Sequence, residues 1–200
     1  MLKLTDVSKH YDNKHILNRL NLHFEGGRLY VITGESGSGK TTLLRILMGL
    51  EEYEGEIVWR EHAKAAVFQE DRLLEHLSAL RNIRLVQQRT AQSAHDISAD
   101  ILALQTLNLG EDLHTPAEKL SGGMRRRVAI IRALESGADV LFFDEALKGL
   151  DEKNRARTLE YIRQKIAGKT VFWVTHDRSE LTALGPCTIY HLADGQLRLN

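Results

Sequence analysis

The amino-acid sequence predicts an α/β protein with a largely parallel sheet, a small antiparallel β part near its start and a helical insertion. Three continuous apolar runs, at residues 29–32, 140–143 and 171–174, are typical of strands that are buried on both faces. Stretches with helical spacing of apolar residues separate these runs. Such alternation favours parallel strands joined by helices.

The first residues have a different pattern. Apolar and polar residues alternate in residues 2–7 and again in residues 20–24, which predicts two half-buried strands. Residues 12–14, Asp-Asn-Lys, are typical of a turn between them. We therefore expect a small antiparallel sheet at the start of the chain.

The middle of the chain changes from short strands to helix. Residues 43–48 read as a helix, and residues 55–59 and 65–68 read as short strands. From residue 73 to residue 109 the spacing of apolar residues is helical. A polar break at residues 91–95 separates two helices in this block, which we interpret as an insertion between strands of the core.

The later part of the chain returns to strands and helices in turn. One helix opens at residues 121–123, another ends near Gly168, and a short helix is expected after Asp177. Residues 188–190 and 196–199 are expected to close the chain as a hairpin.

Length and composition limit the function classes. The chain has 200 residues, of which 42% are hydrophobic and 27% charged, as expected for a globular protein. Its net charge of zero argues against a nucleic-acid partner. The single cysteine, Cys187, excludes an internal disulfide and fits a reducing compartment. No apolar run approaches the roughly 18 residues that span a bilayer, so any membrane role is expected to come through a partner.

The glycine-rich segment after the first apolar run has the pattern G-x-x-x-x-G-K-T. Between a strand and a helix this pattern predicts a loop whose backbone N–H groups hold polyphosphate. Lys40 would reach the β- and γ-phosphates, and the Thr41 hydroxyl would ligate Mg²⁺. The alternative is a flexible Gly/Ser turn. The nucleotide-binding residues predicted here are Gly34, Glu35, Ser36, Gly37, Ser38, Gly39, Lys40, Thr41 and Thr42.

Two carboxylates follow the second apolar run, at the end of a strand where ligands of α/β sheets lie. Asp144 can hold Mg²⁺ opposite Thr41, directly or through water. Glu145 can accept a proton from an attacking water. The alternative is a solvated pair at the end of a strand.

Residues 120–124, Leu-Ser-Gly-Gly-Met, begin a predicted helix about twenty residues before Asp144. With this segment, the sequence resembles the ATP-binding cassette family, the ATPase subunits of ABC transporters, over essentially its whole length. Residues 120–124 are similar to the family signature, which is usually L-S-G-G-Q. The resemblance implies that Ser121, Gly122 and Gly123 contact the γ-phosphate of ATP held by a second copy of the chain.

The resemblance implies roles for four further residues. Gln69 matches the Q-loop glutamine, which senses Mg²⁺ and the attacking water, and His176 matches the histidine that contacts the γ-phosphate. Asp151 matches the D-loop aspartate at the subunit interface; it can also be an ordinary helix N-cap. Tyr11 matches the aromatic residue that stacks on adenine, and its alternative is an edge-strand tyrosine.

The sequence departs from the family pattern in two places. Met124 stands where the signature usually has glutamine. Residues 146–151 are Ala-Leu-Lys-Gly-Leu-Asp where the family usually has Pro-Thr-Ser-Ala-Leu-Asp, so Lys148 and the missing proline change the D-loop. The basic run at residues 125–127 is expected to face solvent or phosphate, as in the family.

The resemblance implies a single cassette domain over residues 1–200, with a core at about 1–69 and 125–200 and a helical subdomain at about 70–124. It also implies a head-to-tail dimer that hydrolyses two ATP molecules and drives an integral membrane permease, with a solute-binding protein. Such a chain would be cytoplasmic and peripheral on the inner face of the cell membrane.

The sequence leaves alternatives for the transported solute and for the class of function. Residues 67–74, followed by residues 80–82, are similar to bacterial importers of the nitrate, sulfonate and taurine group. One alternative function is a small phosphate-loop kinase. Another is a cassette ATPase of translation or chromosome maintenance, although such proteins usually carry two cassettes or long coiled coils.

Overall fold

The computed structural model describes residues 1–59, 63–87 and 97–200. Its larger sheet has the strand order β5-β6-β7-β3-β8-β9. The pairs from β5 to β8 are parallel, and β9 runs antiparallel to β8. This arrangement confirms the predicted α/β fold with a largely parallel sheet. The strands are β3 (Leu29–Thr33), β5 (Lys64–Val67), β6 (Val140–Asp144), β7 (Thr170–Val174), β8 (Thr188–Ala193) and β9 (Gln196–Leu199).

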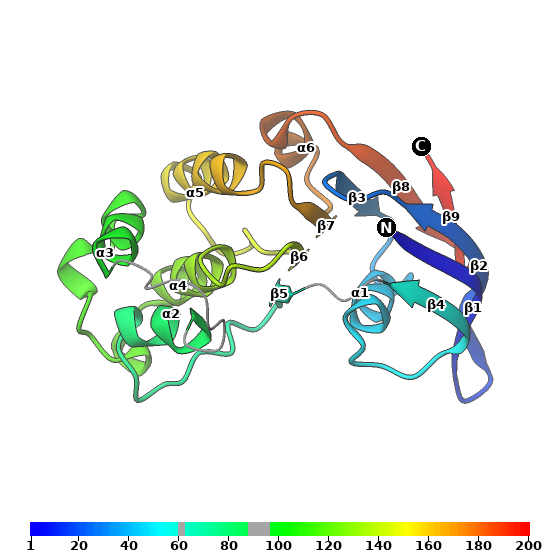
Figure 1. Ribbon diagram of the computed structural model, residues 1–200, viewed down its shortest axis with the longest axis horizontal. Helices are drawn as coiled ribbons and strands as arrows, with labels where there is room; N and C mark the ends of the chain where they lie inside the picture. The colour runs from blue at the N-terminus through cyan, green and yellow to red at the C-terminus, as the bar shows by residue number, and fades with distance from the viewer. Residues whose placement is uncertain (60–62, 88–96) are drawn as a thin grey trace.

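The antiparallel part is a second, smaller sheet at the other end of the molecule from α2 and α3 (Figure 1). Its order is β2-β1-β4, with β1 (Leu2–Tyr11) between β2 (Lys14–Phe24) and β4 (Glu54–Trp59). Leu4 pairs with Leu22 on one side and Ile57 on the other. The two strands predicted from the alternating pattern, β1 and β2, thus pair with each other. The third strand of this sheet, β4, follows the phosphate loop and α1 in the sequence.

Both faces of the central strands are covered, which explains their continuous apolar sequences. Along β6, Leu141 and Phe143 point into the core shared with most of the helices. Val140 and Phe142 point the other way, into the core that lies under the small sheet. Because successive side chains of a strand point to opposite faces, this one apolar run contributes residues to two separate cores.

Helix α1 (Lys40–Met48) lies between the two sheets, with Leu43, Leu44 and Leu47 buried. The opposite face of the large sheet is covered by the helices that contribute to the other core. These helices are α2 (Ala79–Gln87), α3 (Ile97–Thr106), α4 (Gly122–Leu134), α5 (Glu152–Lys165) and α6 (Arg178–Leu184), with short 3₁₀ turns at Gly110–Asp112 and Ala117–Lys119.

The helical block begins later than its sequence pattern predicts. The first helix starts at Ala79 instead of residue 73. The side chain of Asn82 is fully buried and donates to the carbonyl oxygens of Leu74, Leu77 and Ser78. These bonds hold the segment before α2 in turns, because they take backbone groups that a helix would use itself. The predicted break at residues 91–95 lies outside the described residues.

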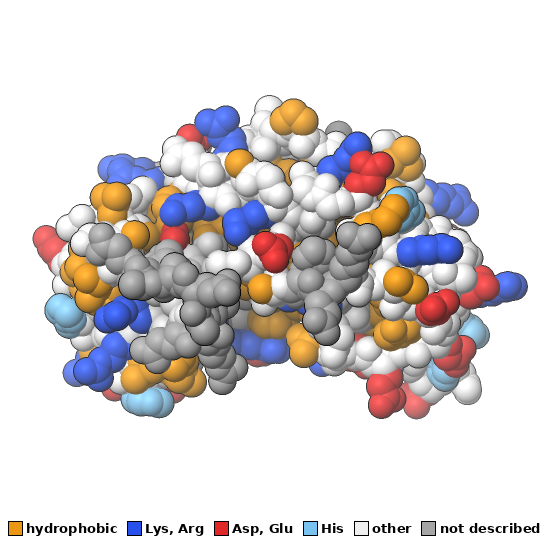
Figure 2. Space-filling view, viewed as in Figure 1, with side chains coloured by type: hydrophobic (Ala, Val, Ile, Leu, Met, Phe, Trp, Pro, Cys, Tyr) orange, Lys and Arg blue, Asp and Glu red, His pale blue; other side chains and the backbone are white. Residues whose placement is uncertain are grey.

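The surface is mixed in charge, and basic and acidic side chains are interspersed on the face shown in Figure 2. Within the described ranges, no helix combines the length and the apolar character needed to cross a membrane. Because β5, β6, β7 and β3 are parallel, the segments after their carboxyl ends leave the same edge of the sheet. That edge carries the candidate site.

Candidate active site

The loop between β3 and α1 needs glycine at two of its positions. Gly34 has a φ of 144°, and a Cβ added there would lie 2.4 Å from the carbonyl oxygen of Leu192. Gly39 has a φ of 105°, and its Cβ would lie 2.6 Å from Cγ2 of Ile16. Since both the backbone angle and the space exclude a side chain, these glycines allow the loop to pass close to its neighbours and enter α1.

Lys40 begins α1 and is 6% exposed. Its Nζ donates to the carbonyl oxygens of Gly34, at 2.9 Å, and Glu35, at 2.6 Å. Burial lowers the pKa of this ammonium group, and the carboxylates of Glu145 and Asp144 oppose that shift. The lysine therefore lies inside the curve of the loop, close to both carboxylates.

Thr41 and Asp144 bring the loop and the end of β6 together. The Thr41 hydroxyl donates to Asp144 Oδ2 at 2.7 Å. Burial raises the pKa of the Asp144 carboxyl, while the hydrogen bond from Thr41 opposes this. The other carboxyl oxygen, Oδ1, is buried without a hydrogen-bond partner. A buried oxygen of this kind beside a hydroxyl is suited to a hard cation, which prefers oxygen ligands.

Glu145 is fixed by its backbone and by two side chains. Its φ of 48° is uncommon for a residue with a side chain, and such backbone angles are enriched at active sites. Its amide donates to the carbonyl of Val174 at 3.0 Å. Oε1 lies 3.0 Å from His176 Nε2, and Oε2 lies 3.1 Å from Lys148 Nζ. Both carboxyl oxygens are therefore engaged.

These residues surround one hollow of about 170 Å³ at the edge of the sheet. It brings together most of the phosphate loop, both carboxylates, the predicted Q-loop glutamine and the histidine after β7. Glu35 and Ser38 line a neighbouring hollow beside the β8–β9 hairpin. The residues lining the first hollow are Ile16, Ser36, Gly37, Gly39, Lys40, Thr41, Thr42, Gln69, Asp144, Glu145, Val174 and His176.

Tyr11 and Asp151 are among the predicted residues that line neither hollow. Tyr11 is 44% exposed at the end of β1, with Lys9 Nζ 4.8 Å from its ring centroid, and it lines neither hollow. Asp151 is the N-cap of α5, where its side chain accepts a hydrogen bond from the backbone N–H of Asn154 at 2.9 Å. The N-cap interpretation of Asp151 is therefore confirmed.

The signature segment starts α4 and does not line the hollow at the phosphate loop of its own chain. Ser121 is the N-cap, and its hydroxyl accepts from the backbone N–H of Met124 at 3.3 Å. A Cβ added at Gly122 would meet open space, and one at Gly123 would lie 3.6 Å from Leu150. The helix start thus has an open approach at Gly122, while Gly123 lies beside Leu150.

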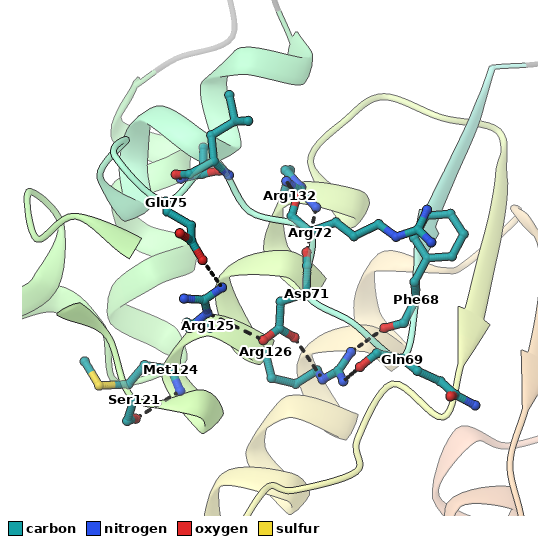
Figure 3. A network of polar contacts seen from close by, with 12 residues as sticks. Phe68, Gln69, Asp71, Arg72, Glu75, Ser121, Met124, Arg125, Arg126 and Arg132 are labelled. Atoms are coloured by element: carbon teal, nitrogen blue, oxygen red, sulfur yellow. Dashed lines mark hydrogen bonds and ion pairs between the residues drawn. The ribbon is translucent and has the colours of Figure 1, made fainter. Parts of the chain in front are cut away.

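Figure 3 shows a network that joins α4 to the segment after β5. Arg126 is 8% exposed and donates to the backbone carbonyls of Phe68 and Gln69. Its Nε lies 3.2 Å from Asp71 Oδ1. Arg132 donates to the carbonyl of Asp71 at 3.0 Å. The expectation that the whole basic run faces solvent or phosphate is wrong for Arg126, because its buried side chain donates to the backbone carbonyls of Phe68 and Gln69.

The contact between Lys148 and Glu145 was not predicted from the sequence either. The only sequence signal for it is their i, i+3 spacing, which brings two side chains together when the backbone turns. The backbone N–H of Lys148 does donate to the Glu145 carbonyl at 3.1 Å, so the segment after β6 makes such a turn.

The fold and the hollow define an α/β protein with a phosphate loop that binds a nucleotide. Its family follows from two findings: the family model described as ABC transporter matches residues 17–148, and a relative is 37% identical over 209 aligned residues. That relative is "Aliphatic sulfonates import ATP-binding protein SsuB 1" from Rhizobium johnstonii, and the match covers 100% of this chain and 76% of the relative. The chain belongs to the ABC transporter ATP-binding family, binds ATP and is an ATPase.

Solved structures agree with this assignment. One is the ATP-binding cassette MJ0796 in a dimeric post-hydrolysis state bound to ADP and phosphate. It has a TM-score of 0.88 and 28% identity, and it covers 100% of this chain and 98% of that chain. The other is a dimeric structure of MJ0796, named as a bacterial ABC transporter cassette, with a TM-score of 0.83, 29% identity and coverage of 98% and 96%.

Proposed function

We propose that this chain is the ATPase subunit of a bacterial importer and that two copies act as a head-to-tail dimer. The relative from Rhizobium johnstonii is named for the import of aliphatic sulfonates. Both MJ0796 structures are dimeric. A sulfonate or a similar oxyanion is the proposed solute, carried by a separate membrane permease that receives it from a solute-binding protein. The chain would lie on the cytoplasmic face of that permease.

One observation carries the dimer proposal: the hollow contains the loop and both carboxylates but not the start of α4. Helix starts bind anions through their free N–H groups, and residues 121–123 present such a start with open space at Gly122. In a head-to-tail pair, this start in one copy would face the phosphate loop of the other. Each ATP would then be held by two chains.

The residues of the hollow fit ATP with Mg²⁺. The loop N–H groups and Lys40 would hold the β- and γ-phosphates. The unpartnered Oδ1 of Asp144 is available for a cation, and the Thr41 hydroxyl and Gln69 would complete its protein ligands. Mg²⁺ supplies positive charge that offsets the charge of the phosphate oxygens.

Glu145 would act as the general base in hydrolysis. Its carboxylate would accept the proton of a water that attacks the γ-phosphorus in line with the bond to ADP. His176, 3.0 Å from Glu145 Oε1, would contact the γ-phosphate. Gln69 and Tyr11 would position the water and the adenine. Release of phosphate and ADP would reopen the dimer and move the permease.

A mixing experiment tests the shared site. K40M removes the lysine of the loop, and G123D places a negative charge at the start of α4, where an added Cβ would make only ordinary van der Waals contacts. Each variant alone should be inactive. Mixed in equal amounts before ATP is added, they form heterodimers with one intact site, so about a quarter of the wild-type ATPase activity should return.

The controls are the same variants mixed with the double variant K40M/G123D, which cannot form an intact site with either. No recovered activity in the K40M and G123D mixture, with both variants folded by circular dichroism, would contradict the head-to-tail site. Full activity of G123D alone would contradict the role of α4.

A further inference from the structure

The segment between β6 and α5 places Lys148 next to Glu145, the proposed general base. Ala146 and Leu147 are buried in the helical core and anchor the segment. Lys148 follows them, and its side chain is 75% exposed while that of Glu145 is 16% exposed. The backbone hydrogen bond from Lys148 to Glu145 turns the chain back, so the ammonium group lies 3.1 Å from Oε2.

The two carboxyl oxygens of Glu145 have different partners. Oε1 faces His176 at 3.0 Å, and Oε2 faces Lys148. The backbone of Glu145 is held in place, because its amide donates to the carbonyl of Val174. The Lys148 side chain is 75% exposed and that of His176 is 45% exposed, so the lysine is the more easily displaced of the two partners. A hollow lined by Ser36, Glu145, Lys148 and His176 gives solvent access to this contact.

We propose that Lys148 is a positioning residue that slows hydrolysis by pairing with Glu145 until the carboxylate accepts the proton of the attacking water. The proposal rests on Glu145 being the base, as inferred above. In the reaction, an O–H bond of water breaks, its proton passes to Glu145, the water oxygen bonds to the γ-phosphorus and the bond to ADP breaks. As the carboxylate takes up the proton, it loses the charge that attracts Lys148.

The ion pair therefore stabilises the state before proton transfer more than the transition state, which raises the barrier. Its effect is bounded by the strength of an exposed ion pair. Removing the ammonium should raise kcat by about 1.4-fold to 5-fold, the range that such pairs allow. The KM for ATP should stay the same, because among the described residues the Lys148 ammonium pairs with Glu145 and makes no hydrogen bond or ion pair to the phosphate loop.

Three variants of the 200-residue chain separate the effect of charge from the effect of side-chain shape. K148M keeps the length of the side chain without its charge and should raise kcat. K148R keeps the charge and should retain the wild-type kcat. K153M is the matched control, since it removes the same charge from the exposed start of α5 and should leave kcat unchanged. An unchanged or lower kcat in K148M, or a K148R variant that behaves as K148M does, would overturn the proposal.

A second measurement excludes an action through the dimer contact. In the E145Q background, K148M should leave the ATP-dependent dimer fraction unchanged in analytical ultracentrifugation, because Lys148 then has no carboxylate to restrain. A shift in that fraction would overturn the proposal. Failure of the underlying function would look different: E145Q itself would hydrolyse ATP at the wild-type rate.

Discussion

Replacement of Arg126 by methionine should destabilise the protein strongly, although the residue lies in a run of three arginines. R126M keeps the aliphatic stem but removes the guanidinium that donates to the carbonyls of Phe68 and Gln69 and pairs with Asp71. Burial raises the pKa of Asp71, and Arg126 is the strongest of the arginines that oppose this shift. The variant thus leaves two carbonyls and one carboxylate with fewer partners (Figure 3).

The magnitude follows from these contacts. A hydrogen bond to a charged group contributes roughly 1.5–3 kcal/mol, and the loss of several in one network is less than additive. Arg125 and Arg132 remain near Asp71 and compensate part of its charge. We therefore expect the free energy of unfolding to fall by about 3 kcal/mol. For a chain of this size that corresponds to a decrease in Tm of about 6–12 °C.

Urea denaturation followed by circular dichroism, with a thermal scan, measures this loss. The matched control is R125M, because among the described residues the ion pairs of Arg125 are longer, 3.9 Å to Asp71 and 3.4 Å to the exposed Glu75. It should lose less than about 1 kcal/mol. In R126M the backbone of Gln69 loses its hydrogen bond from Arg126, so Gln69 should be held less firmly in the site. The variant should therefore also have a lower kcat, with little change in the KM for ATP. If R126M were as stable as R125M, the network around Arg126 would not hold the segment after β5.

Three further outcomes are expected. G34A should abolish ATP binding in isothermal titration calorimetry, because a Cβ at Gly34 would lie 2.4 Å from a backbone carbonyl oxygen. N82A should lower the free energy of unfolding by about 2–4 kcal/mol, measured in urea, since Asn82 is fully buried and holds several backbone groups. Hydrogen bonds from Ser179 and then Arg155 lower the pKa of Asp177 from 3.8 to about 2. The charged form of Asp177 therefore stabilises the folded protein above its unfolded pKa, and this stabilisation is lost as the pH falls through about 2. The difference in free energy of unfolding between wild type and D177N should shrink from about pH 5 to about pH 2. A difference that stays constant over this range would contradict the shift in pKa.

The parts of the site that the sequence predicts are formed by residues that are close together in the chain. The phosphate loop is a continuous segment whose glycines, lysine and threonine are read directly, and the strand before it and the helix after it are continuous with it. Asp144 and Glu145 follow a buried strand, and parallel pairing brings that strand's end to the loop. Local pattern and sheet geometry together therefore place Thr41 against Asp144.

The parts that sequence does not predict depend on contacts between distant or irregular segments. Arg126 binds carbonyls 57 and 58 residues earlier in the chain, and an arginine run alone is equally compatible with a solvated face. The start of α2 depends on the bonds of one buried asparagine, which helical spacing does not reveal. The pairing of Lys148 with Glu145 requires the turn after β6, whose sequence lacks the usual proline.

The most direct test of the proposed function is the behaviour of E145Q. The variant keeps the shape of Glu145 but cannot accept a proton as a carboxylate does. With ATP and Mg²⁺ it should form stable dimers in size-exclusion chromatography and show no measurable phosphate release. Phosphate release at the wild-type rate would contradict the assignment of Glu145 as the base, and a chain that stays monomeric with ATP would contradict the shared site.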